Sequence, residues 1–182
     1  MNRILLVLLA ALSVSTTACE EANKTTRRRS TPPRPEPTVM KVLRDANPNR
    51  MALIVAPKAE DIEGDGQADL INVSVVLFDE PRPEPVIVPG VFRFEAVPLK
   101  DEESTDLPRM IWEFNETQTR AAEGPTMFGF PGYRFQLDVR SLGRGPIPAR
   151  VVNIEAIFQP ASGGPPVKCL PDQRLVRLGN TG

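Results

Sequence analysis

The sequence predicts an all-β fold, an antiparallel β-sandwich of immunoglobulin-like type with about seven or eight strands. Two observations predict it. Apolar and polar residues alternate over short runs, and the 20 prolines and 12 glycines fall largely between those runs. Alternation with a period of two is the signal of half-buried strands, whereas Pro and Gly mark the turns that connect them. A small β-barrel is the alternative architecture.

Eight segments carry the strand pattern. They are Met51–Ala56, Ile71–Phe78, Pro85–Val88, Val91–Val97, Arg109–Phe114, Tyr133–Val139, Ala149–Phe158 and Arg174–Leu178. Pro85–Val88 is short, so it could be an edge strand. Proline fits such a position, because it cannot donate a hydrogen bond to a central strand pair. Such closely spaced short strands, separated by turn residues, favour a sandwich over a parallel α/β sheet.

The sequence contains few signals of helical structure. Phe114–Gly124 has room for about two helical turns, ended by Gly124 and Pro125. Every aromatic residue lies between Phe78 and Phe158, so we expect the main core in that span. Trp112 is the natural centre of this core, and we interpret it as a packing residue rather than a ligand platform.

The N-terminus has the layout of a secretory signal peptide over residues 1–18. Arg3 precedes an apolar run from Ile4 to Leu12, which is too short for a membrane span. The segment resembles a bacterial lipoprotein signal, whose lipobox ends in a small residue and then cysteine, here Ala18 and Cys19. That resemblance implies a diacylglyceryl group on the thiol of Cys19 and a fatty acid, such as palmitate, on its amine. An ordinary secretory signal is the alternative.

Two neighbouring residues refine this expectation. Thr16 stands where the lipoprotein family usually has Leu, whereas Glu20 rather than Asp follows the cysteine. By resemblance to the sorting rule of such lipoproteins, Glu20 favours the periplasmic side of the outer membrane. We therefore expect a cell-envelope protein whose acyl chains bind a membrane, at about 0.8 kcal/mol per buried methylene.

Residues 19–39 read as a disordered tether rich in Pro and Arg. The segment lacks aromatics, and Pro32, Pro33, Pro35 and Pro37 bias it toward polyproline II. At about 3.1 Å per residue it could hold a domain up to roughly 60 Å from the membrane. Residues 40–182 are then the β-sandwich domain.

The strand order also resembles a group of uncharacterised planctomycete lipoproteins. The motifs that carry the resemblance are "LFDE", "VPGVFRFE", "IWEF", "GYRFQLDV" and "VVNIEAIFQP", which lie between Ile71 and Pro166. It implies a single β-sandwich on a lipid anchor, and it implies no activity.

The chain offers little reaction chemistry. It has no histidine, which removes Ser-His-Asp and Cys-His nucleophilic sites and nearly every zinc enzyme site. Cys169 is the one thiol outside the signal, and we expect it to pack as a small hydrophobe. Asp101, Glu102, Glu103 and Asp106 read as a solvated loop rather than a glycosidase acid pair. We therefore expect no enzymatic activity, no catalytic residue and no cofactor.

One acidic segment has a near match to a calcium loop. Asp61, Glu63, Asp65 and Asp69 take acidic positions of an EF-type loop, and Gly66 takes its sharp turn. The twelfth position is an asparagine rather than the bidentate glutamate. We favour an acidic turn that feeds a strand, and a weak Ca²⁺ site is the alternative.

These observations predict a non-enzymatic, membrane-anchored envelope lipoprotein whose β-sandwich is a binding or structural module. Its partner would be an unknown envelope protein or polysaccharide, and a net charge of −1 gives no reason to expect nucleic acid. A calcium-stabilised carbohydrate- or ligand-binding module is the alternative. Candidate contact surfaces are the turn Pro81–Pro85 and the loop that contains Phe128 and Phe130. For these two phenylalanines we favour folding back onto the core over exposure.

Overall fold

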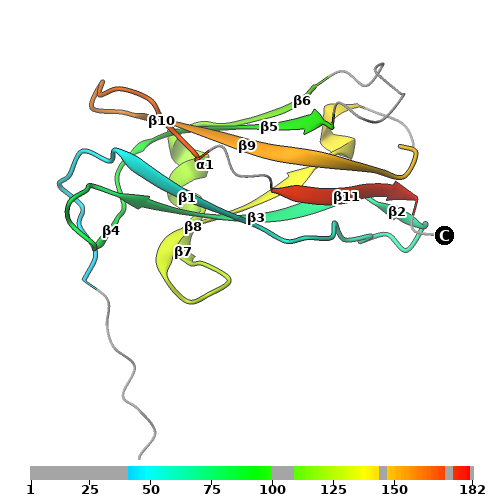
Figure 1. The fold of residues 1–182 in the computed structure, drawn as a ribbon, viewed down its shortest axis with the longest axis horizontal. Coiled ribbons are helices and arrows are strands. Elements are labelled where there is room, and N and C mark those ends of the chain that lie inside the picture. The colour runs from blue at the N-terminus through cyan, green and yellow to red at the C-terminus, as the bar shows by residue number, and fades with distance from the viewer. Residues whose placement is uncertain (1–40, 100–108, 144–146, 171–173, 181–182) are drawn as a thin grey trace, which may run out of the picture. The chain divides into compact units, whose positions relative to one another are not determined.

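The computed structural model describes residues 41–99, 109–143, 147–170 and 174–180, and these residues form two antiparallel sheets. The sheets lie in two layers, as Figure 1 shows. The fold class is therefore confirmed as an all-β sandwich. The alternative architecture, a small barrel, is not observed, because the described strands belong to two separate sheets.

The first sheet, sheet A, contains five strands. Its order is β1 (Arg50–Val55), β3 (Leu70–Phe78), β8 (Pro131–Asp138) and β7 (Glu123–Pro125). A two-residue strand, β4 (Pro85–Val86), pairs with the end of β3. Along β8, the buried Tyr133, Phe135 and Leu137 alternate with the exposed Arg134 and Gln136, so this strand buries one face and leaves the other polar.

The second sheet, sheet B, contains six strands. Its order is β2 (Gln67–Ala68), β11 (Leu175–Asn180), β9 (Arg150–Pro160), β5 (Gly90–Pro98) and β6 (Met110–Phe114). The short strand β10 (Val167–Lys168) pairs with β9. All strand pairs in both sheets are antiparallel.

An aromatic cluster fills the space between the sheets. The ring of Phe92 lies 5.0 Å from the rings of Tyr133 and Phe135 and 4.6 Å from that of Phe158, measured between centroids. Phe92 and Phe158 come from sheet B, and Tyr133 and Phe135 come from sheet A, so the cluster joins the layers. Aromatic pairs at such separations stabilise a core beyond their buried area.

Trp112 is buried, as predicted, and it also holds a polar contact between the sheets. Its indole Nε1 donates a hydrogen bond of 2.8 Å to the carbonyl of Asp138 at the end of β8. A buried indole N–H without a partner would destabilise the fold, so this acceptor explains how a tryptophan can sit there.

The predicted helix is present as α1 (Glu116–Ala121). Asn115 and Gln118 form a capping box, in which each side chain accepts from the backbone amide of the other. A short 3₁₀ turn, η1 (Arg140–Leu142), follows β8. Every predicted strand is recovered, but β2, β7 and β10 were not predicted because two or three residues cannot show an alternating pattern.

The signal peptide, Cys19, the tether and the acidic residues 101–106 lie outside the described residues. Among the described residues, no helix is long and apolar enough to cross a membrane.

Candidate functional site

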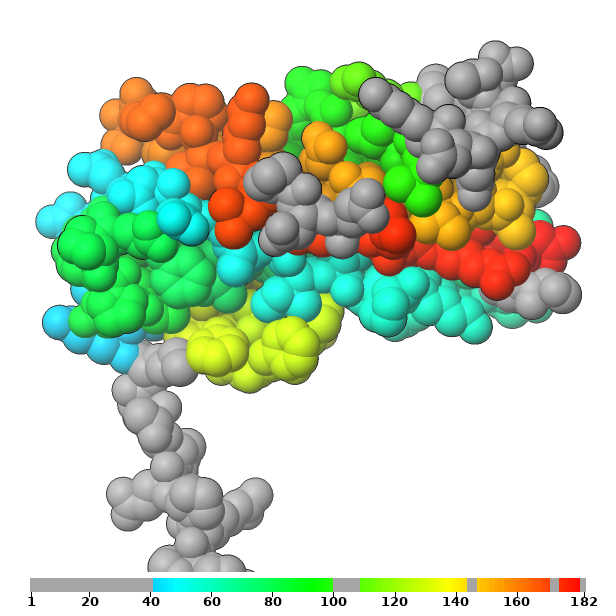
Figure 2. All heavy atoms as spheres, in the orientation of Figure 1, coloured from blue at the N-terminus to red at the C-terminus, as the bar shows by residue number. Residues whose placement is uncertain are grey.

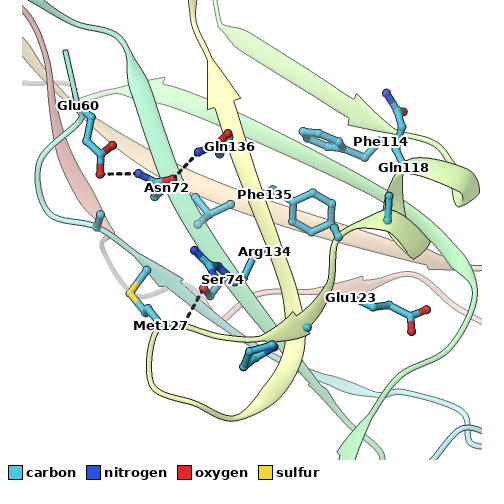
Figure 3. Close-up of a pocket in the computed structure, with 16 residues that line it drawn as sticks. Glu60, Asn72, Ser74, Phe114, Gln118, Glu123, Met127, Arg134, Phe135 and Gln136 are labelled. Atoms are coloured by element: carbon cyan, nitrogen blue, oxygen red, sulfur yellow. Dashed lines mark hydrogen bonds between the residues drawn. The ribbon is translucent and has the colours of Figure 1, made fainter. Parts of the chain in front are cut away.

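The outer face of sheet A carries an open groove of about 950 Å³. Figure 3 shows it between α1 and the segment before β3, with β3 and β8 as its floor. Its lining includes Asn72, Ser74, Phe114, Met127, Arg134 and Gln136. The volume lies within the range of about 300–1,000 Å³ that is typical of ligand sites.

Strand alternation places the polar side chains of the floor. Along β8, Tyr133, Phe135 and Leu137 are buried, so the intervening Arg134 and Gln136 point to the outer face. The register with β3 sets Ser74 opposite Arg134 and Asn72 opposite Gln136. Two polar rungs therefore cross the floor, roughly 7 Å apart along the strands.

Hydrogen bonds hold one of these rungs in position. Nε2 of Gln136 donates to Oδ1 of Asn72 at 3.4 Å, and Nδ2 of Asn72 donates to Oε1 of Glu60 at 2.8 Å. The chain of contacts fixes the amide of Asn72, because both its donor and its acceptor are used. It leaves Oε1 of Gln136 free of any hydrogen bond to a described residue.

The second rung consists of Ser74 and Arg134, and it carries an exposed positive charge. Within the described parts of the chain, the guanidinium of Arg134 forms no hydrogen bond and no ion pair, and it is exposed. The nearby Glu123 pairs with Arg44, whose Nη1 lies 3.4 Å from Oε2. The remaining charges of the lining are those of Glu60 and Arg134, which have opposite signs, so the net charge of the groove is close to zero.

A hairpin between β7 and β8 bounds the groove on one side. The amide of Thr126 donates to the carbonyl of Phe130 at 2.7 Å, and the amide of Gly129 donates to Thr126 at 2.9 Å. Gly129 has φ +80°, a left-handed conformation that favours glycine. The amide of Met127 donates to Oγ of Ser74 at 3.3 Å, which ties the hairpin to the groove floor.

The two phenylalanines of this hairpin do not fold back onto the core. Phe128 is 68% exposed and Phe130 is 42% exposed, so the favoured expectation of a core role was wrong. Gly129 between them turns the chain at the tip, and the core positions are already filled by the aromatic cluster. In Figure 2 the yellow hairpin segment stands out from the lower edge of the domain. The other predicted surface, Pro81–Pro85, is exposed at Pro81 but buried at Pro85.

The acidic segment forms a tight turn, as favoured, and Asp61 organises it. The carboxylate of Asp61 accepts hydrogen bonds from the amides of Gly64 at 2.7 Å, Asp65 at 3.2 Å and Gly66 at 2.8 Å. Desolvation pushes the pKa of Asp61 upward, but the three amides outweigh it and hold the pKa below its ordinary value.

The remaining carboxylates of this loop converge on a side chain that the sequence did not point to. Arg140, in η1, forms ion pairs with Glu63, Asp65 and Asp69, and its Nη2 lies 2.8 Å from Oδ2 of Asp65. The hydrogen bond that Arg140 donates to the carboxylate of Glu63 is the main reason that the pKa of Arg140 is raised. A guanidinium thus occupies the position that the calcium alternative assigns to a metal ion.

The donor set is correspondingly poor for a metal. Asp61 is committed to backbone amides, and the other three carboxylates are shared with Arg140. In the part of the chain that the structure describes, no three His, Cys, Asp or Glu side chains are grouped to hold a metal ion. Calcium binding, the alternative to the favoured acidic turn, stays untested. Sequence spacing could not have found Arg140, because it lies about 70 residues away from the loop that it neutralises.

Cys169 is half-buried, and its Sγ accepts from the amide of Ala156 at 3.3 Å. This placement agrees with the expected packing role.

Comparison with protein-family models, with curated proteins and with solved structures finds no match.

Proposed function

We propose that this protein is a non-enzymatic lipoprotein of the bacterial envelope that uses sheet A as a binding face. The binding face consists of the groove and the hairpin from Thr126 to Phe130. The observation that carries the proposal is the exposure of Phe128 and Phe130 at the hairpin tip, next to Met127, which lines the groove.

An aromatic ring that is exposed to water is unfavourable in free energy, and burial against a binding partner would remove this penalty. Fully burying a phenylalanine stabilises a protein by about 1.5–3 kcal/mol relative to leaving it in water. Met127, Phe128 and Phe130 are all more than 40% exposed on one short hairpin. Contiguous apolar patches of this kind mark interaction sites more often than single surface hydrophobes do.

The hairpin is also held well enough to present these rings. It is paired to β8 through Gly124 and Gly132, and its amide at Met127 is bonded to Ser74 of β3. A defined loop loses less conformational entropy on binding than a free one, so more of the contact energy contributes to affinity.

The N-terminal sequence supports a membrane-bound setting for this module. The lipobox-like segment that ends at Ala18–Cys19 favours acylation, with palmitate as a typical acyl group, and Glu20 favours the outer membrane. The Pro-rich tether over residues 19–39 would let the domain reach ligands away from the lipid surface. The planctomycete lipoprotein resemblance supports the same setting.

The anchor is tested by replacing Cys19 with serine in the full-length protein. We expect the wild type to take up labelled palmitate and to remain with the membrane fraction. The Cys19→Ser variant should lose the label. Equal labelling of both proteins would show that Cys19 is not the acylation site.

The binding face is tested by crosslinking the full-length protein in its own envelope. We expect the double variant Phe128→Ser/Phe130→Ser to fold normally, because both rings are exposed, and to lose the crosslinked component. Leu175→Ser is the matched control, because Leu175 is 40% exposed on β11 of the other sheet. If the hairpin variant captures the same component as the wild type, the proposed binding face is wrong.

A further inference from the structure

We infer that the groove on sheet A binds a neutral polysaccharide chain, with Arg134 and Gln136 as its principal polar contacts. The inference rests on the proposed function, because it assigns a ligand class to the same binding face.

The polar side chains of the groove match the edges of sugar rings. Hydroxyl groups both donate and accept hydrogen bonds, so a site for them needs donors and acceptors close together. The guanidinium of Arg134 offers only donors, whereas the amide oxygen of Gln136 is a free acceptor among the described residues. They lie on one strand with a single residue between them, and both point to the same face.

The polar groups of the groove are also held in position before any ligand binds. The amide of Gln136 is held by Asn72, which is held in turn by Glu60. Ser74 lies opposite Arg134 and accepts from the amide of Met127. Polar groups that are already positioned lose little side-chain entropy when a ligand binds.

The apolar part of the lining suits the faces of sugar rings. The groove contains Phe114, Met127 and Pro125 beside its polar rungs. A pyranose ring has C–H groups on its faces and hydroxyls on its edge, so it requires both kinds of surface within one site. The exposed rings of the hairpin extend the apolar surface beyond the groove, which suits a chain longer than one sugar.

The charge of the groove favours a neutral chain over an anionic one. Arg134 faces a lining that also contains Glu60 and Glu123, and Glu123 is shared with Arg44. A polyanion would place several negative charges near these carboxylates, and sites for polyanions instead gather several cations.

A peptide is a less suitable occupant. Peptides that add to β-sheets pair with an edge strand through their backbone. Of the two strands that carry the polar rungs, β3 is paired on both sides, with β1 and β8, so its backbone groups are used within sheet A. β8 pairs with β7 only over Pro131–Tyr133, and Arg134 just beyond donates its amide to the carbonyl of Ala122 at 2.8 Å.

The test is affinity electrophoresis of the full-length protein in detergent through gels that contain a polysaccharide. The neutral probes are a β-glucan, a galactomannan, dextran and a soluble chitin derivative, and the anionic probe is polygalacturonate. We expect at least one neutral probe to retard the wild-type protein, with weaker retardation by polygalacturonate. Arg134→Ala should bind that probe about tenfold more weakly, because one charged hydrogen-bonding group is removed.

Arg177→Ala is the matched control, because Arg177 is an exposed arginine on β11 of the other sheet. We expect it to behave as the wild type. Gln136→Ala should weaken binding without changing the melting temperature, since the side chain is exposed. Equal retardation of the wild type and Arg134→Ala would overturn the assignment of the site.

The outcomes separate this inference from the proposed function. If no neutral probe retards the wild type while the Phe128→Ser/Phe130→Ser variant still loses its envelope crosslink, the polysaccharide is excluded and the binding face stands. Retardation by polygalacturonate alone would overturn the neutral ligand class. If crosslinking is unchanged in the hairpin variant, the proposed function itself fails.

Discussion

The hydroxyl of Tyr133 is bonded twice to the same residue, Val88. It donates to the carbonyl of Val88 and accepts from its amide, both at 2.9 Å. Tyr133 lies on β8 of sheet A, and Val88 lies between β4 and β5, just before the chain enters sheet B. These two hydrogen bonds therefore hold in place the segment through which the chain passes from sheet A to sheet B.

Replacing Tyr133 with phenylalanine should destabilise the domain without changing its fold. The ring would still pack against Phe92, but the buried amide and carbonyl of Val88 would lose their partner. Each unsatisfied buried group costs about 1–3 kcal/mol, so we expect the free energy of unfolding to fall by about 2–4 kcal/mol. Urea denaturation measures this change. A decrease below about 0.5 kcal/mol would contradict the role of the hydroxyl.

The same residue predicts a loss of stability at high pH. Burial is the main cause that raises the pKa of Tyr133 to about 12 from its ordinary 10. Between these values the unfolded chain releases the phenolic proton while the folded protein keeps it. The contribution of Tyr133 is therefore complete below pH 10 and is lost toward pH 12, at about 1.4 kcal/mol per pH unit.

Tyr133→Phe provides the control for this pH dependence. Alkaline pH affects the rest of the two proteins alike, so the relevant quantity is the difference between them in urea midpoint. We expect that difference to narrow as the pH rises from 10 to 12. Parallel curves for the wild type and the variant would argue against a raised pKa.

Two paired glycines of the hairpin should respond differently to the same substitution. A methyl group at Gly132 would clash with the carbonyl of Val75 and would lie 2.9 Å from Cγ2 of Thr126. Gly124, its partner across β7 and β8, has no atom within 4 Å of the added Cβ. We expect Gly132→Ala to lower the free energy of unfolding by about 1–3 kcal/mol and Gly124→Ala to change it little. Equal melting temperatures for the two variants would contradict the close packing of the hairpin on β3.

The acidic loop predicts a dependence on Arg140 that calcium can reveal. Arg140→Gln removes the cation shared by Glu63, Asp65 and Asp69, so the melting temperature without calcium should fall. Calcium should then raise the melting temperature of this variant more than that of the wild type, because the carboxylates are released to bind it.

Arg177→Gln serves as the control for that experiment, because Arg177 contacts the segment before the loop through its backbone carbonyl and its side chain forms none of the ion pairs of Glu63, Asp65 and Asp69. It should melt as the wild type does, with or without calcium. Calcium could instead stabilise the wild type as strongly as it stabilises the Arg140→Gln variant. The loop would then bind the metal beside Arg140, and the calcium alternative would gain support.

Much of the fold could be predicted from the sequence, because a strand with one buried face has a local signature. Tyr133–Val139 alternates without a break, and the structure recovers it as β8 with its apolar residues inside. The short helix within Phe114–Gly124 was likewise predicted and is observed as α1, because helix stop signals such as Gly124 and Pro125 are local. The short strands β2, β7 and β10 have no such signature.

The candidate site was predicted less well. The exposure of Phe128 and Phe130 depends on whether the core has space for two more rings, and the cluster around Phe92 has already filled it. Adjacent residues do not reveal this, because the rings of the cluster come from both sheets.

By itself, the sequence determined the class of the fold, the polar and apolar faces of its long strands and the absence of histidine chemistry. These properties are local or compositional, so they can be read along the chain. Only the tertiary structure decided that Asn72 and Gln136 share a rung, that Arg140 neutralises the acidic loop and that the hairpin lies beside a groove. Each of these depends on strand register, which brings together side chains that are many residues apart.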